Sequence, residues 1–246
     1  GFGKTGTGTW ILSGANTYTS TTNVSDGVLQ VGKAGVGQTG TGIVTVSSTT
    51  GTGRLSGTGI IRGSAFNLNT GAFLYAGDGI TAANHGTLTF TPTAGGTYTL
   101  ASGSIVTLDI GSATTNDPTF GGGNAVGSAG YNAWADAVSG VGNHDRLVFD
   151  GTSGTLTFSS NLVVVLDGYT PVLGDAFNLL DWSLALTTNF SGMQFTLPDI
   201  STSGLAWDVS RFTTSGVLVV VAVPEPGRMM LMTMGLALLV LRRRRR

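Results

Sequence analysis

Short runs of alternating apolar and polar residues, separated by glycine, asparagine or aspartate, recur through the first 223 residues of the chain. In the segment GTLTF at residues 86–90, the leucine and phenylalanine fall on one face of an extended chain and the two threonines on the other. The same five letters return at residues 154–158. Helical periodicity is weak before residue 227, although residues 131–138 can form a short helix. The pattern therefore predicts an all-β body.

Strands this short, repeated over more than 200 residues, leave a sandwich, a barrel or a solenoid as candidate folds. The segment WILSGANTYTSTTNVSDGVLQVG at residues 10–32 favours the solenoid. Its two apolar runs flank a polar stretch, and Leu12 and Leu29 are 17 residues apart, which is close to one short coil. Glycine suits the tight corners of such coils, and threonine and asparagine suit side-chain ladders between them.

We therefore expect residues 10 to about 110 to stack as coils of parallel strands. The residues expected to point into the core include Leu12, Leu29, Val31, Val44 and Val46. The stretch LSGANTYTSTTNVSDGVLQVG, at residues 12–32, is similar to the autotransporter-associated β-helix repeat of bacterial passenger domains. Residues 53–79 resemble the segment that usually follows this repeat. The resemblance implies a right-handed parallel β-helix (β-solenoid) over residues 1–110 and a β-rich C-terminal part of the body over residues 111–223.

Charge is distributed unevenly along the 246 residues, although the formal net charge is only −1. Residues 1–223 hold twelve acidic and six basic side chains, whereas the remainder holds Glu225 and six arginines. An acidic body argues against nucleic acid as a partner, because phosphate binding needs clustered lysine and arginine. The absence of cysteine excludes disulfides, thiol catalysis and cysteine metal sites. Since the chain begins with Gly1 rather than methionine, we expect an export signal upstream.

The last 23 residues, 224–246, form a separate unit in this sequence. Residues 227–241 are mostly apolar, and as a helix they would reach about 22 Å, which is shorter than the ~30 Å hydrocarbon core of a bilayer. The run is followed by five terminal arginines: Arg242, Arg243, Arg244, Arg245 and Arg246. The positive-inside rule keeps these arginines in the cytoplasm. The sequence therefore predicts one short C-terminal transmembrane helix with the β-rich body outside.

Pro224, Glu225 and Pro226 precede this apolar run, and the two prolines separate it from the preceding strand. Pro-Glu-Pro, a short apolar helix and a terminal arginine cluster, in this order, resemble the PEP-CTERM sorting signal of Gram-negative bacteria. The resemblance implies processing by an exosortase near Pro-Glu-Pro. It also implies an inner-membrane precursor and a mature protein at the cell surface or secreted, associated with exopolysaccharide or biofilm. An uncut membrane anchor is the alternative.

Two glycine-rich segments, GFGKTG at residues 1–6 and GVGQTG at residues 35–40, fit the spacing G-x-G-x-x-G. Such matches are expected by chance in a chain with 40 glycines, and neither segment precedes a predicted helix that could hold a phosphate. His85 and His144 are interpreted as solvated loop residues. The pair His144 and Asp145 would point to opposite faces of a strand, and no third metal ligand is evident.

Parallel β-helices also host enzymes that cleave polysaccharides, which need two or three acids on one face. Five aspartates flank apolar runs at turns, where aspartate is favoured for local hydrogen bonds: Asp145, Asp150, Asp167, Asp175 and Asp181. The oxygen-rich segment at residues 114–124 lacks the regular acid spacing of a calcium loop. We therefore expect neither a catalytic site nor a cofactor or metal site.

The sequence as a whole favours an exported, non-enzymatic structural protein of the cell surface or extracellular matrix. The alternatives are a carbohydrate-binding or carbohydrate-active β-helix and an adhesin. Aromatic side chains can discriminate between them, because a sugar-binding platform needs several on one exposed face. The candidates for such a platform are Tyr18, Tyr75, Tyr98, Trp134 and Tyr169.

Overall fold

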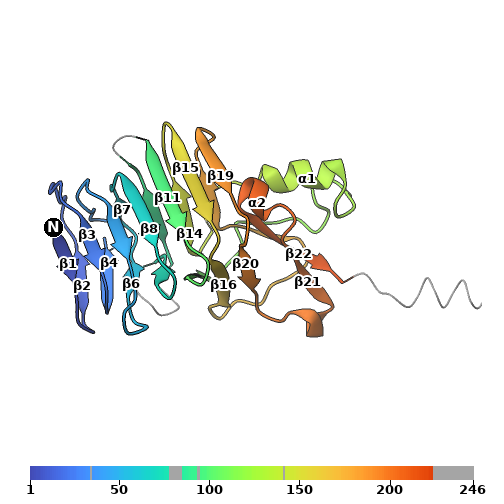
Figure 1. Cartoon of the computed structure of the whole chain (residues 1–246). Helices are drawn as coiled ribbons and strands as arrows, with labels where there is room; N and C mark the ends of the chain where they lie inside the picture. The colour runs from blue at the N-terminus through green and yellow to red at the C-terminus, as the bar shows by residue number, and fades with distance from the viewer. Residues whose placement is uncertain (34, 78–84, 93–94, 141, 224–246) are drawn as a thin grey trace, which may run out of the picture.

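A computed structural model describes residues 1–33, 35–77, 85–92, 95–140 and 142–223. Two long parallel sheets, each of seven strands within these residues, run side by side along the body (Figure 1). The first sheet contains, in spatial order, β1 (Phe2–Lys4), β3 (Thr22–Val24), β5 (Val44–Val46), β8 (Ala65–Leu68), β11 (Gly96–Leu100), β15 (Gly154–Phe158) and β19 (Leu186–Asn189). The second contains β2 (Thr9–Leu12), β4 (Val28–Val31), β6 (Arg54–Ser56), β9 (Phe73–Tyr75), β12 (Ile105–Ile110), β16 (Asn161–Leu166) and β20 (Gln194–Thr196).

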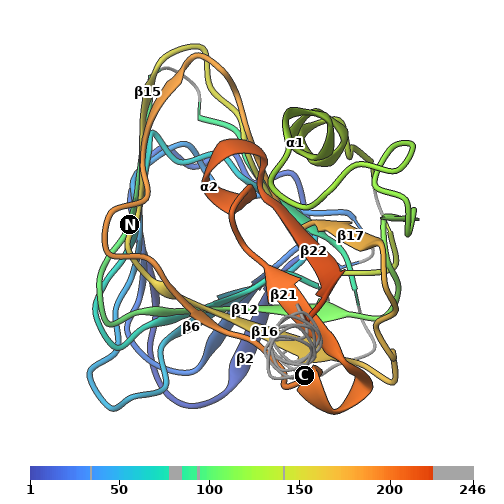
Figure 2. The ribbon, with the colours of Figure 1, turned by 90° about the vertical axis from the view of Figure 1, so that its right-hand side faces the viewer.

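A third parallel sheet begins at the third coil. It contains β7 (Ile60–Ile61), β10 (Thr87–Phe90), β14 (Arg146–Phe149) and β18 (Leu180–Trp182). One coil thus passes through β8, β9 and β10 before the chain returns to the first sheet at β11, and Figure 2 shows the coils stacked end-on. The predicted all-β body of stacked parallel coils is confirmed. Right-handed winding stays a prediction.

Parallel pairing continues beyond residue 110, where the sequence placed the end of the repeat region. β12 pairs with β16 in register from Ile105 with Asn161 to Ile110 with Leu166, and β16 pairs in turn with β20. The coils therefore extend into the part of the body that was expected only to be β-rich.

Alternation along each strand sends one row of side chains into the core. In the second sheet the register aligns Leu29 with Leu55 and Leu55 with Leu74, and all three are fully buried. Burying a leucine side chain of this kind stabilises the fold by about 1.5–3 kcal/mol. Four of the predicted core residues are fully buried, and these are Leu29, Val31, Val44 and Val46. Leu12 is only partly buried, in the first coil, where it packs against the same core.

The separation of Leu12 and Leu29 is close to the length of the first coil, as predicted, but slightly shorter than it. Leu29 pairs with Trp10 rather than lying opposite Leu12, and Leu12 pairs with Val31. The coil is therefore longer than the separation of Leu12 and Leu29, because the polar corner between the strands takes additional residues.

Aromatic side chains join the first and third sheets inside the middle coils. The rings of Phe90 and Phe149 stack with centroids 4.5 Å apart, and Phe66 lies 4.7 Å from Phe90. Tyr98 meets Phe149 edge-on at 5.2 Å and donates a hydrogen bond of 2.5 Å to the carbonyl of Asp150. Offset and edge-on pairs of this kind add to the stability that burial alone provides.

Between β12 and β14 the chain leaves the coils and forms β13 (Thr115–Asn116) and α1 (Ala129–Asp136). The short helix expected near residues 131–138 is therefore present. Ser128 caps it by accepting a hydrogen bond from the backbone N–H of Tyr131.

An antiparallel sheet lies at the C-terminal end of the coils. Its strands are β13, β17 (Asp175–Asn178), β22 (Val217–Ala222) and β21 (Leu205–Asp208), accompanied by α2 (Phe212–Ser215) and the 3-10 helix η1 (Ser201–Ser203). A second small core lies here, where α1 packs on this sheet, and its buried residues are Phe120, Tyr131, Ala135, Ala176, Val217, Val219 and Val221. Such a cap ends a solenoid without leaving its last coil open.

The described chain ends just after β22 at Val223, which is 38% exposed. The predicted sorting signal and transmembrane helix, residues 224–246, lie outside the described residues. Among the residues that are described, none of the helices has the length and apolar character needed to cross a bilayer.

Candidate functional site

His144 is buried, so its interpretation as a solvated loop residue is wrong. Its side chain lies just before β14, and the residue is 2% exposed. Nε2 is 2.7 Å from Oγ1 of Thr114 and accepts the backbone N–H of Gly142 at 3.2 Å. Nδ1 lies 3.0 Å from the carbonyl oxygen of Asp145. Because a carbonyl only accepts, this network assigns the proton of the neutral ring to Nδ1.

The hydroxyl of Thr114 fits the same assignment, since its oxygen already accepts the backbone N–H of Asn178 at 3.0 Å and its proton is free for Nε2. Burial lowers the pKa of His144 below its ordinary value of 6.5. Both ring nitrogens are therefore occupied by structural hydrogen bonds, and the imidazole is held neutral. The hydrogen bond between His144 and Thr114 connects the two ends of the segment between β12 and β14.

Asp145 is also buried, at 3% exposure, and its carboxyl group joins three segments. Oδ1 accepts the backbone N–H of Gly86 at 3.0 Å, and Oδ2 accepts the backbone N–H of Asp109 at 3.1 Å. Burial raises the pKa of Asp145 to about 8, although the two backbone donors act in the opposite direction. A carboxyl group enclosed in this way cannot reach a substrate, so its chemistry serves the fold.

Asp109 interacts electrostatically with Asp145 and also with His85 and Asp167. Nε2 of His85 is 3.7 Å from Oδ2 of Asp167, and this nitrogen makes no hydrogen bond to any described residue. The side chain of His85 is 6% exposed, so its interpretation as solvated is also wrong. Burial raises the pKa of Asp109, and the nearby Asp167 acts in the same direction. Sequence missed this group because its members come from different coils.

The described residues contain no set of three or more histidine, aspartate or glutamate side chains arranged to hold a metal ion. Asp117, in the oxygen-rich segment at residues 114–124, is engaged within its own loop. Its Oδ1 accepts the backbone N–H and the hydroxyl of Thr119, and its Oδ2 accepts the backbone N–H of Gly121 at 2.7 Å. This is the local hydrogen bonding expected of aspartate at a turn.

Asp175 and Asp181 also have structural partners. Asp175 is buried and accepts hydrogen bonds from the hydroxyl of Tyr169, the backbone N–H of Val172 and the side-chain amide of Asn116, each within 2.8 Å. Asp181 forms an ion pair with Arg146. The turn interpretation of Asp175 accounts for the bond to Val172 but misses the two longer-range bonds, because local sequence does not specify them.

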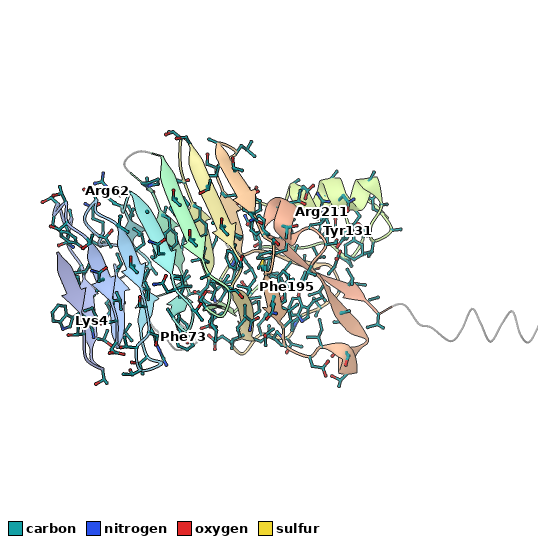
Figure 3. The ribbon with its side chains drawn as sticks, in the orientation of Figure 1. Lys4, Arg62, Phe73, Tyr131, Phe195 and Arg211 are labelled. Carbon is teal, nitrogen blue, oxygen red and sulfur yellow. The ribbon has the colours of Figure 1, made fainter. Side chains whose placement is uncertain are left out.

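Lys4, the lysine of GFGKTG, is buried at the edge of the first sheet and labelled in Figure 3. Its ammonium group donates to the carbonyl oxygens of Thr5, Gly6 and Asp26 at 3.1, 2.5 and 3.0 Å. Gly27 lies against it, and a Cβ there would come within 2.6 Å of Nζ. The segment forms strand β1 and a corner, and its lysine is occupied by backbone oxygens, so this segment has none of the features of a phosphate-binding loop.

The five candidate platform aromatics do not share one exposed face. Tyr98 is buried in the coil core, and Trp134 lies on α1 against Phe120. Tyr18 contacts Phe2 in the first coils, Tyr75 stacks beside Phe73 on β9, and Tyr169 meets Phe177 near the cap. This dispersal counts against a sugar platform built from these five residues.

Comparison with known protein families finds a match at the N-terminal end of the chain. Residues 2–31 match the family described as passenger-associated-transport-repeat, and these residues form β1 to β4, the first two coils. No curated protein and no solved structure matches the chain. The match supports the autotransporter-associated repeat predicted from the sequence. Together with the parallel coils, it indicates an exported, passenger-like β-helix.

Proposed function

We propose that the chain is a non-enzymatic element of the bacterial cell surface or extracellular matrix. The observation that carries this proposal is the stack of parallel coils whose first two coils contain the passenger-associated repeat. Solenoids present long surfaces for their size and need no catalytic centre to act as scaffolds. In support, the histidine and aspartates that offered the best catalytic chemistry are engaged in hydrogen bonds inside the fold.

Delivery in this proposal depends on the C-terminal segment. Residues 227–241 cross the inner membrane, the terminal arginines stay in the cytoplasm, and Pro224, Glu225 and Pro226 are presented outside to an exosortase. The exposed end of β22 at Val223 supports this order, because the signal then starts outside the packed core.

The experiment is an intact-mass measurement on protein recovered from the cell surface and from the medium. We expect mature protein to end close to residue 224 and to lack the arginines. Surface or secreted protein that still carries Arg242 to Arg246 would contradict the sorting proposal and leave a plain membrane anchor. The same preparations are assayed for cleavage of polysaccharides, and measurable depolymerisation would contradict the non-enzymatic role.

A further inference from the structure

Two adjoining hollows lie at the C-terminal end of α1, and we call them together the α1 groove. The first, of about 270 Å³, is lined by Thr115, Trp134, Ala137, Val138 and Ser139. The second, of about 300 Å³, is lined by Asp136, Val138, Ser139, Asp181, Trp182, Leu184, Thr214 and Ser215. Val138 and Ser139 line both hollows, so the two lie next to each other. The second volume is at the lower end of the range of about 300–1,000 Å³ for small-ligand sites, and the first is just below it.

Each hollow contains one half-buried tryptophan that is fixed from behind by other rings. Trp134 lies 5.5 Å from Phe120 and 6.0 Å from Tyr131 between ring centroids. Trp182, at the end of β18, lies 5.1 Å from Phe190. A rigid indole costs little entropy when it binds, and it offers a flat apolar face beside a polar edge. The groove therefore presents two preformed aromatic surfaces, one for each hollow.

The two carboxylates of the groove are already paired with arginines. Arg211, labelled in Figure 3, binds both oxygens of Asp136 through Nε, at 3.0 Å, and Nη2, and so links α2 to α1. Arg146 pairs with Asp181. The side chains of Asp136 and Asp181 remain 35% and 39% exposed, so their oxygens can still accept hydrogen bonds from a ligand. Paired charges favour a neutral ligand over a cation or an anion.

Hydroxyl groups complete the lining, supplied by Thr115, Ser139, Thr214 and Ser215. Tryptophan side chains, paired carboxylates and hydroxyls that line two adjoining hollows match a chain of neutral sugar rings, which has apolar C–H faces and many O–H donors. The acidic body, with twelve acids against six bases, disfavours an acidic polymer.

We propose that the α1 groove binds a neutral polysaccharide, with one sugar ring against Trp134 and a neighbouring ring against Trp182. This inference deepens the proposed matrix role and rests on it for its biological setting. Binding is measured without any processing step, so a negative result here is distinguishable from failure of the sorting proposal, which intact mass decides.

The test is affinity electrophoresis of the full chain in a detergent without sugar headgroups, through gels containing dextran, laminarin, galactomannan or alginate. We expect retardation by at least one of the three neutral polymers and none by alginate. Thr214→Lys, which fills the groove, and Trp182→Ala, which removes one aromatic face, should each weaken binding at least tenfold. Thr213→Lys is the matched control, because Thr213 is the exposed neighbour on α2 and does not line either hollow.

Equal effects of Thr213→Lys and Thr214→Lys would overturn the proposal. Retardation by alginate alone, or by none of the four polymers, would overturn it as well. Thermal melting of each variant separates loss of the groove from loss of the fold: Thr214→Lys should melt at the wild-type temperature. If Trp182→Ala melts early, Thr214→Lys still decides the outcome.

Discussion

Val164 and Val165 are consecutive valines of β16, and Val164 is 3% exposed whereas Val165 is 37% exposed. Val164 pairs with Leu108 in the inward row, and Val165 lies on the outer face of the same sheet. The pair therefore gives an internal test of the coil architecture. Val164→Thr should destabilise the body by about 1–3 kcal/mol, because it buries a hydroxyl group without a partner.

Val165→Thr is the matched control, and its effect should stay within about 0.5 kcal/mol because the new hydroxyl remains in water. Urea unfolding followed by circular dichroism measures both variants. Equal losses of stability would contradict the assignment of inner and outer faces in β16.

The coils could be predicted from the sequence because the pattern of inward and outward residues is contained within each short strand. Alternation in each short strand identifies the inward residues, and Leu29, Val31, Val44 and Val46 are all buried as expected. The same logic cannot place His144, because its burial depends on Thr114 and Gly142, and Thr114 lies on the far side of α1 in the sequence. No periodic pattern encodes such a contact.

The α1 groove was unpredictable for a related reason. Trp134 and Trp182 belong to separate elements. Asp136 finds Arg211 only when α1 lies against α2, and Asp181 finds Arg146 only when β18 pairs with β14. Sequence identified Trp134 as one of several candidate aromatics and Asp181 as a turn residue. It contained no signal that would bring them to the same side of the molecule.

Asp145→Asn tests the carboxyl group that connects the start of β14 to β12 and to the residue before β10. The amide oxygen can accept only one of the two backbone N–H groups, and the amide nitrogen faces the other donor. We expect a loss of about 1–3 kcal/mol. Denaturant unfolding at pH 4 measures it, and Asp150→Asn, at an exposed residue just after β14, serves as the control.

The pH dependence of the same variant follows from the pKa of Asp145, which is about 8 in the folded chain against 3.8 without the fold. Between these values the folded state binds more protons, so this group's contribution to stability falls as pH rises. Asparagine does not titrate. The free energy of unfolding of wild type should therefore exceed that of Asp145→Asn by less at pH 8 than at pH 4. A larger difference at pH 8 would contradict the raised pKa of Asp145.

His144→Ala should lower stability at pH 7 by about 1–3 kcal/mol, because the hydroxyl of Thr114 and the N–H of Gly142 lose their acceptor. Burial lowers the pKa of His144 in the folded chain, so its stabilising contribution is complete above pH 6.5 and is lost as pH falls below that value. Thermal melts between pH 5 and pH 8 should show this loss in wild type and a weaker one in the variant. Unchanged stability at pH 7 would show that the ring is not enclosed as described.

The five terminal arginines are expected to set orientation through charge alone. Replacing all of them, from Arg242→Glu to Arg246→Glu, should remove the main orientation signal, because a short apolar helix needs that bias to stop transfer. The precursor should then be misinserted or untethered, as measured by protease accessibility of the body in spheroplasts. The matched variant with five lysines keeps the charge and should behave as wild type. If the lysine variant also fails, recognition of arginine itself replaces the charge argument.

Glu225→Ala should act at a different step from the arginine changes. The apolar run and the cationic end remain intact, so the protein should still reach the membrane with its body outside. Without the glutamate of Pro-Glu-Pro, however, the processing enzyme should not cleave, and full-length chain should accumulate in the membrane fraction. Intact mass distinguishes the two species, because the uncleaved chain retains all residues to Arg246 whereas mature wild type ends close to residue 224. Normal cleavage of Glu225→Ala would remove Pro-Glu-Pro from the recognition signal and leave the helix and its charges as the only determinants.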